Sequence, residues 1–333
     1  MKQDLVHGGA IDVMRTDYPD APKPWIDLST GINPWPYPNI KLSRKALTHL
    51  PTSADYQACQ QAMATAIDAP PQTLILAPGS ELLIRLLPDI ISAERVAILS
   101  PTYGDHTEAW RRAGVEIMHS ENPLGLASMA DIVVVTQPNN PDGRVFTLQA
   151  LESARQELAR RGGWLIIDEA YVDLRPEQSL ARHEAGADGL ILLRSFGKFF
   201  GLAGLRLGAM LAPESLADAM AKRLGVWPIS GAALEIGTRA YSDIDWQIQT
   251  RTLLANAAAC LDSLLNETNL RVIGGTDLFR FIEHPNANDV FEHLAQHGIY
   301  VRRFAWSKQH LRIGLPANSE AEARLGTALS FLA

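Results

Sequence analysis

The sequence has few cysteines, no long apolar run and no surplus of basic residues. Its 333 residues include only Cys59 and Cys260, too few for a disulfide framework or a zinc cluster, so we expect a reducing compartment. No run reaches the roughly 18 apolar residues that would predict a membrane span. The net charge of −7 argues against a protein that binds nucleic acid or an anionic membrane, because such proteins carry a basic surplus or cluster.

Signals for export and for nucleotide binding are also missing. The first ten residues, MKQDLVHGGA, lack the apolar run of a secretion signal, so we expect a cytoplasmic protein. No G-x-G-x-x-G follows an expected strand, and Gly197-Lys198 is followed by Phe199 rather than by Ser or Thr, which argues against the common nucleotide-binding motifs. The sequence does have the ordinary balance of a globular protein, with 47% apolar and 20% charged residues. Its length is sufficient for two lobes.

Short runs rich in Val, Ile and Leu alternate with helix-like segments between residues 72 and 212. Near-continuous apolar runs predict strands that are covered on both faces, and hence a mostly parallel α/β sheet. Helices are expected between several of the strands, at 80–91, 104–113 and 147–161. The runs are TLILA (73–77), RVAILS (95–100), VEIMHS (115–120), DIVVVT (131–136), WLIID (164–168), LILLRS (190–195) and RLGAML (206–211).

The character of the sequence changes on both sides of this region. Residues 21–38 carry five prolines and cannot form a long helix, but they are rich enough in apolar residues to pack as an extended arm. After about residue 225, long helical patterns at 243–266, 286–296 and 319–332 flank short strands near 279–283, 300–302 and 310–313, which predicts a smaller α+β lobe. We therefore expect an N-terminal arm (1–40) on the small lobe and active site, a large domain (41–225) and a small C-terminal domain (226–333).

Chemically distinctive residues follow five of the expected strands. Ligands of parallel α/β sheets bind beyond the carboxyl ends of the strands, so these residues are expected to lie near one another. Pyridoxal 5′-phosphate needs an amine for its aldehyde, an acid beside its pyridine nitrogen, donors for its phenolic oxygen, a flat partner for its ring and anion binders for its phosphate. The five turns offer all of these, in Gly79-Ser80-Glu81, Tyr103, Asn140, Asp168 with Tyr171, and Ser195 with Lys198 and Arg206.

Lys198 stands among Phe196, Phe199 and Phe200. A free lysine has a pKa of about 10.4 and is almost wholly protonated near neutral pH. Desolvation favours the less charged, nucleophilic form, so we interpret Lys198 as a covalent anchor and proton carrier. The alternative interpretation is a surface lysine whose charged end reaches solvent.

The motifs QPNNPDG (137–143), DEAY (168–171) and SFGK (195–198) with GLR (204–206) resemble the landmarks of fold-type-I pyridoxal-phosphate enzymes, in the branch that contains histidinol-phosphate aminotransferase. The resemblance covers nearly the whole chain and implies an aspartate-aminotransferase-like fold and a homodimer. It further implies that Lys198 binds the cofactor aldehyde and that Asp168 pairs with the pyridine nitrogen. The remaining implied contacts are Asn140 and Tyr171 to the phenolic oxygen, Tyr103 to the ring, and Gly79, Ser80, Glu81, Ser195 and Arg206 to the phosphate.

The arm and the small lobe resemble the decarboxylases of this branch that act on L-threonine O-3-phosphate. The resemblance rests on HGGA at His7 and on IDLSTGINPWPYP (26–38), and it implies substrate contacts from His7, Gly8, Gly31, Asn140, Arg302 and Arg312. Two arginines, a histidine and glycine N–H groups suit a phosphoamino acid with about three negative charges.

We therefore expect pyridoxal-phosphate-dependent decarboxylation of this substrate to (R)-1-amino-2-propanol O-phosphate and carbon dioxide, for cobalamin biosynthesis. An aminotransferase of the same branch and a non-catalytic regulatory module are the alternatives. Whether Arg312 binds the carboxylate or the phosphate stays open.

The sequence departs from the family pattern at several positions. Related enzymes often carry a tyrosine before a proline that reaches the cofactor phosphate of the partner subunit, whereas this chain has His49-Leu50-Pro51, with Tyr56 further on. Gly197 replaces a common Ser, Asp142 a common Thr, and Gly31 an Asn of some relatives. Elsewhere, His293 and His297 are expected to be solvated helix residues, and Asp105-His106 and Glu283-His284 to be ordinary surface pairs.

Overall fold

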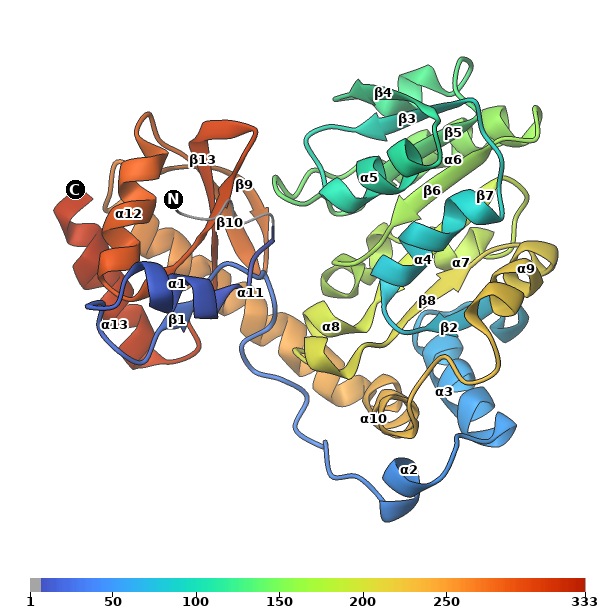
Figure 1. Ribbon diagram of the computed structural model, residues 1–333, viewed down its shortest axis with the longest axis horizontal. Helices are drawn as coiled ribbons and strands as arrows, with labels where there is room; N and C mark the ends of the chain where they lie inside the picture. The colour runs from blue at the N-terminus through green and yellow to red at the C-terminus, as the bar shows by residue number, and fades with distance from the viewer. Residues whose placement is uncertain (1–6, 333) are drawn as a thin grey trace. The chain divides into compact units, whose positions relative to one another are not determined.

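The computed structural model describes residues 7–332, and its contacts divide the chain into two compact units. The large unit contains Pro36–Asn140 and Arg144–Gln247. The small unit combines the N-terminal arm up to Trp35 with Pro141–Gly143 and the chain from Ile248 onward. Each unit has its own sheet (Figure 1). Each unit also has its own buried apolar side chains.

A seven-stranded sheet forms the centre of the large unit, in the order β2-β8-β7-β6-β5-β3-β4. β8 runs antiparallel to β2 and β7, and the other neighbouring pairs are parallel, which confirms the expected mostly parallel α/β sheet. The strands are β2 (Leu74–Ala77), β3 (Arg95–Leu99), β4 (Glu116–Ser120), β5 (Ile132–Thr136), β6 (Trp164–Asp168), β7 (Leu190–Ser195) and β8 (Gly208–Leu211).

Helices cover both faces of this sheet, which explains why its central strands are almost uniformly apolar. α4 (Ser80–Leu86), α5 (Gly104–Arg112) and α9 (Glu214–Leu224) pack on the face that contains Ile166 and Leu193. α6 (Leu148–Ala159) lies on the other face (Figure 1). Every residue of β5 is buried, as expected for a strand at the centre of three layers.

The large unit extends beyond α9 as far as Gln247. α10 (Gly231–Ser242) packs against α3 (Ser53–Ala66) of the large unit, and a Cβ atom at Gly237 would lie 2.9 Å from the Cys59 sulfur. α10 therefore belongs to the large unit, because a face of this helix with small residues such as Gly237 packs closely on α3. The division into an arm (1–40), a large domain (41–225) and a small domain (226–333) stays a prediction.

The small unit contains a four-stranded antiparallel sheet in the order β12-β13-β10-β9. The arm joins this unit through β1 (Ile26–Asp27), which pairs in parallel with β11 (Ile299–Tyr300). No helix within residues 7–332 is both long and apolar enough to cross a bilayer. The other elements are α1 (Ile11–Asp17), α11 (Ile244–Asn266), which begins in the large unit, β9 (Arg271–Thr276), β10 (Phe279–Glu283), α12 (Ala287–Gln296), β12 (Arg302–Phe304), β13 (Ser307–Gly314) and α13 (Ser319–Leu329).

Candidate active site

A buried carboxylate lies at the end of β6. Asp168 is only 3% exposed, and its Oδ2 lies 2.9 Å from Nε2 of His106, which is 1% exposed. The backbone N–H of Ala170 donates to the other oxygen of Asp168 at 3.1 Å. Each oxygen retains a second lone pair, so the carboxylate can accept a further hydrogen bond.

The expectation that Asp105-His106 is a surface pair was wrong. α5 buries Asp105, His106, Ala109 and Trp110, which lie on one face of the helix toward the sheet. The recurrence of apolar residues three and four positions after His106 was the signal in the sequence that could have placed this histidine inside. His106 is therefore a site residue that the sequence interpretation missed.

Tyr103 precedes α5 and packs beside the same histidine. Its ring is edge-on to the His106 ring, with the two centroids 6.3 Å apart. Burial, reinforced by a hydrogen bond to Asp105, raises the pKa of the Tyr103 phenol above its usual range. Tyr103 thus presents a neutral aromatic ring at the end of the strand that precedes it.

The predicted catalytic lysine follows β7, the neighbour of β6 in the sheet. Lys198 lies in α8 (Phe196–Phe199), directly after β7, and its Nζ lies 5.9 Å from the centroid of the Tyr171 ring. β6 and β7 are parallel neighbours, with Asp168 opposite Leu193. The carboxylate, the phenol and the amine therefore leave the same edge of the sheet from adjacent strands. Phe196, Phe199 and Phe200 are fully buried, as the apolar run predicts, and the lysine itself is half-buried.

Arg206 lies against the N-terminus of α4. A Cβ atom at Gly79 would lie 2.8 Å from a terminal guanidinium nitrogen of Arg206, and the Glu81 carboxylate lies 3.6 Å from the same nitrogen. Arg206 has a left-handed backbone, with φ of 53°, which is uncommon for a residue with a side chain and concentrates at functional sites. A Cβ atom at Gly208 would lie 2.6 Å from the Ser80 nitrogen. Gly208 is paired with Ser195, so β8 brings the predicted phosphate residues together.

The turn after β5 is fixed by Asn139 rather than by Asn140. Asn139 is buried, and its amide accepts from the Thr102 hydroxyl at 2.7 Å and donates to the Pro101 carbonyl at 3.0 Å. Asn140 follows it and is half-buried. Asn139 thus holds the turn that contains Asn140, the residue predicted to contact the ligand.

The residues of the large unit fit pyridoxal 5′-phosphate. A buried carboxylate that can accept from a ring N–H, a neutral aromatic ring, a phenol beside an amine, and an arginine over a glycine-capped helix N-terminus provide the required contacts. All the predicted cofactor residues occur in this one unit.

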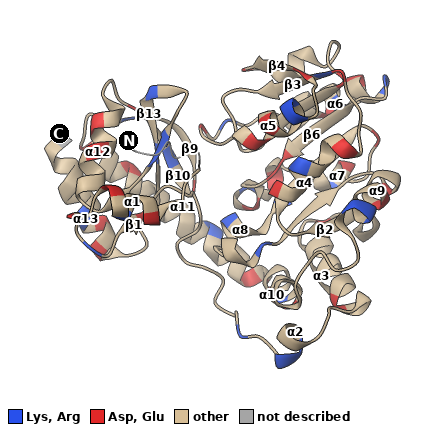
Figure 2. Cartoon of the chain, in the orientation of Figure 1, with Lys and Arg blue, Asp and Glu red and all other residues tan. Residues whose placement is uncertain are grey.

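Two arginines face each other in the sheet of the small unit. Arg302 of β12 is directly opposite Arg312 of β13. Figure 2 shows Lys and Arg residues of the small unit in blue. Guanidinium groups are suited to bidentate hydrogen bonds with a carboxylate or a phosphate. Arg312 is 5% exposed, its guanidinium lies 4.8 Å from the Phe279 ring centroid, and it donates to the Ser29 carbonyl at 2.6 Å.

The N-terminal arm brings Gly8, a predicted substrate residue, next to Ser29, the residue that Arg312 contacts. A Cβ atom at Gly8 would lie 2.5 Å from the Ser29 carbonyl oxygen, so only glycine fits there without a shift of the backbone. The Ser29 hydroxyl accepts from the Gly9 N–H at 2.8 Å, and the Tyr300 hydroxyl donates to the His7 carbonyl at 3.4 Å. Thus His7 and Gly8 lie near the segment that Arg312 contacts. Gly31 has φ of +60°, a conformation that favours glycine.

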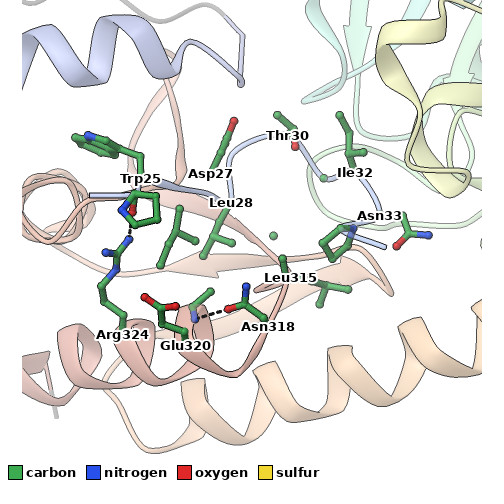
Figure 3. A pocket seen from close by; sticks show the side chains of 17 residues that line it. Trp25, Asp27, Leu28, Thr30, Ile32, Asn33, Leu315, Asn318, Glu320 and Arg324 are labelled. Carbon is green, nitrogen blue, oxygen red and sulfur yellow. Dashed lines mark hydrogen bonds between the residues drawn. The ribbon is translucent and has the colours of Figure 1, made fainter. Parts of the chain in front are cut away.

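A pocket of about 440 Å³ lies between the arm and α13 in the small unit (Figure 3). Gly31 is the one predicted substrate residue that lines it, and Arg302 and Arg312 do not. Asn318 and Arg324 on its wall are engaged in hydrogen bonds to Ala321 and to the Pro24 carbonyl (Figure 3). This hollow is therefore distinct from the pair of arginines.

The two histidines of α12 are partly buried rather than solvated. The His293 and His297 rings lie 4.4 Å apart, and Nε2 of His293 lies 2.9 Å from the Ala328 carbonyl oxygen. The expectation of solvated side chains was wrong, because α13 packs beside α12. Within residues 7–332, no group of three His, Cys, Asp or Glu residues could hold a metal ion.

Known proteins resemble this chain along most of its length. The sequence matches aminotransferases of class I and II over residues 25–325. A curated threonine-phosphate decarboxylase from Pseudomonas aeruginosa is 40% identical over 328 residues, 98% of this chain and 97% of that protein. A second, from a Sinorhizobium species, is 38% identical over 334 residues, 99% of each protein.

The fold also matches a solved structure. Histidinol-phosphate aminotransferase from Sinorhizobium meliloti, in complex with pyridoxal 5′-phosphate, has a TM-score of 0.85 at 20% identity. The match covers 96% of this chain and 93% of that one, and it supports the fold alone. Together with the family match over residues 25–325, these similarities show that the chain belongs to the class I and II aminotransferase family.

Proposed function

We propose that this chain is a pyridoxal-phosphate-dependent decarboxylase that converts L-threonine O-3-phosphate to (R)-1-amino-2-propanol O-phosphate and carbon dioxide, as a step of cobalamin biosynthesis. The observation that carries the proposal is the similarity to threonine-phosphate decarboxylases over nearly the whole chain. The opposed Arg302 and Arg312 support a small substrate with two anionic groups.

The residues of the large unit would hold the cofactor. Lys198 would bind its aldehyde, and Asp168, held by His106, would accept a hydrogen bond from its ring nitrogen. When bound, pyridoxal 5′-phosphate withdraws electrons from the substrate Cα, so that the carboxylate can leave as carbon dioxide. The remaining contacts would be Tyr103 with the ring, Asn140 and Tyr171 with the phenolic oxygen, and Gly79, Ser80, Glu81, Ser195 and Arg206 with the phosphate.

The chain must also bind both ends of the substrate and replace the lost carboxylate by a proton. Nζ of Lys198 would deliver the proton to Cα. Arg302 and Arg312 would each take one anionic group, and His7, Gly8, Gly31 and Asn140 would complete the contacts. Which arginine takes the carboxylate determines which bond at Cα is broken.

A carbon-dioxide assay tests this function. The purified protein with pyridoxal 5′-phosphate should be yellow and should release carbon dioxide from L-threonine O-3-phosphate with no 2-oxo acid present. Lys198→Ala should abolish the release and the change in visible absorbance on addition of substrate. Amino transfer to 2-oxoglutarate in place of carbon-dioxide release would favour an aminotransferase, and a protein that stays colourless with added cofactor would contradict both enzymes.

We also propose that the protein is a cytoplasmic homodimer. Large apolar side chains are exposed on the large unit in two places, around α2 (Arg44–Thr48) and just before α10. A second copy of the chain would cover them. The Tyr56 hydroxyl accepts from the Leu76 N–H at 2.8 Å within its own chain, and this contact still leaves its O–H able to donate. The exposed residues are Ile40, Leu47, Leu50, Val226 and Trp227.

A further inference from the structure

A fully buried charge network lies beneath the strand ends of the large unit. Arg194, at the penultimate position of β7, is 2% exposed. Its guanidinium donates to the Glu169 carboxylate at 2.8 Å and to the Asp173 carboxylate at 2.7 Å. The Ser179 hydroxyl donates to the same oxygen of Glu169 at 2.9 Å. Three buried charged groups in one place are costly to desolvate, and the predicted site residues do not include any of them.

The network lies on the sheet face opposite that of Asp168. Successive residues of a strand point to opposite faces. Ile166 and Leu193 belong to the core under α4, α5 and α9, which places Asp168 on that face. Glu169 and Arg194 are one residue further along their strands and therefore point to the other face.

The three charged residues are neighbours in sequence of the predicted catalytic residues. Glu169 follows Asp168, and Asp173 follows Tyr171 by two positions. Arg194 precedes Ser195 and lies four positions before Lys198. The Arg194 guanidinium thus links the segment after β6 to the end of β7. It does so by two charge-assisted hydrogen bonds, and its planar shape fixes their geometry.

We propose that Arg194 is a positioning residue for the candidate active site: it fixes the segment that carries Asp168 against the segment that carries Lys198. Backbone pairing between β6 and β7 ends at Asp168 and Leu193, supplemented by the Glu169 N–H to the Leu193 carbonyl at 2.8 Å. Beyond that point the network supplies a cross-link between the β6 and β7 segments that backbone pairing between these two strands no longer provides. The inference rests on the proposed function only in requiring that pyridoxal 5′-phosphate binds there.

A charge-neutral variant separates positioning from stability. Replacing a buried ion network as a whole by uncharged groups often preserves stability, whereas removing one member leaves a buried charge unpaired. The test variant is therefore Glu169→Gln/Asp173→Asn/Arg194→Met. The control is Glu152→Gln/Arg155→Met/Glu184→Gln, which removes a similar network from α6 and α7 (Ala181–Glu184), where Arg155 lies 2.6 Å from Glu152 and 3.6 Å from Glu184.

The readouts are the melting temperature, the pH midpoint of the visible absorbance of the protein loaded with pyridoxal 5′-phosphate, and kcat and KM. With melting temperature near that of the wild type, we expect the test variant to shift the pH midpoint by about half a unit or more, because the distance between carboxylate and amine changes. We expect kcat to fall by about 10- to 100-fold with a smaller change in KM. The control variant should leave the midpoint unchanged.

A test variant that melts like the wild type, with an unchanged midpoint and kcat, would overturn the proposal. Should it fail to fold, Arg194→Lys, which keeps the charge but loses the planar fork, must show the same shift. Failure of both variants to fold would assign the network to folding and would also count against positioning. If the wild-type protein itself develops no visible absorbance with pyridoxal 5′-phosphate, the proposed function fails, independently of Arg194.

Discussion

At the scale of single residues, burial separates two cysteines that are chemically identical in the sequence. Cys59 is wholly buried between α3 and α10, whereas Cys260 on α11 is exposed. Burial raises the pKa of the Cys59 thiol to about 12, so its reactive thiolate is scarce at ordinary pH. We expect iodoacetamide at pH 8 to label only Cys260 in the folded protein and both cysteines in denaturant. Labelling of Cys59 at a comparable rate in the folded protein, measured by mass spectrometry, would contradict this environment.

Arg312 is expected to contribute to substrate binding and not to cofactor binding. Arg312→Ala should lower kcat/KM for L-threonine O-3-phosphate by about 10- to 150-fold, because a hydrogen bond to a charged group contributes about 1.5–3 kcal/mol. The yellow colour should persist, since the predicted cofactor residues all lie in the large unit. Steady-state kinetics alongside a visible spectrum provide the measurement. A variant with unchanged kcat/KM would refute the assignment, and a colourless one would show that Arg312 supports the cofactor instead.

At the scale of elements, helix α13 depends on the residue before it. The Asn318 side chain accepts from the Ala321 N–H at 2.9 Å and so satisfies a donor that the helix leaves unpaired. Asn318→Ala should lower the free energy of unfolding of the small unit by about 1 kcal/mol. Asn318→Asp retains the acceptor and should cost much less. Urea denaturation followed by circular dichroism distinguishes the two, and equal losses would show that the cap contributes little.

At the scale of the whole molecule, the exposed apolar residues determine the expected assembly. Trp227 is 58% exposed and Leu50 is 63% exposed, both in the large unit. A charge placed in the middle of an apolar interface is strongly unfavourable, so Leu50→Arg/Trp227→Arg should convert a dimer to a monomer. Light scattering coupled to size-exclusion chromatography measures the mass. Met129→Arg, which alters a residue of the same unit that is 51% exposed, is the control and should remain dimeric.

The strand positions show how much of the fold was accessible from the sequence. Each of the seven runs from TLILA to RLGAML became a strand. In the central strands, burial on both faces leaves an uninterrupted apolar signal, whereas β4 is a partly exposed strand at the edge of the sheet. The strand expected at 300–302 appears instead as β11 and β12, and β9 was not anticipated at all. β9 reads RVIGGT, with two glycines and mixed burial, so a local pattern could not identify it.

The sequence by itself determined the ordered residues at the strand ends and the family they indicate, because ligand groups follow the carboxyl ends of parallel strands. Only the tertiary structure decided which residues support them. His106 and Arg194 reach Asp168 and Glu169 across 62 and 25 residues of sequence, respectively. Such contacts depend on the order of the strands and on the face each side chain takes. A single local pattern contains neither, so these partners became visible only once the sheet was assembled.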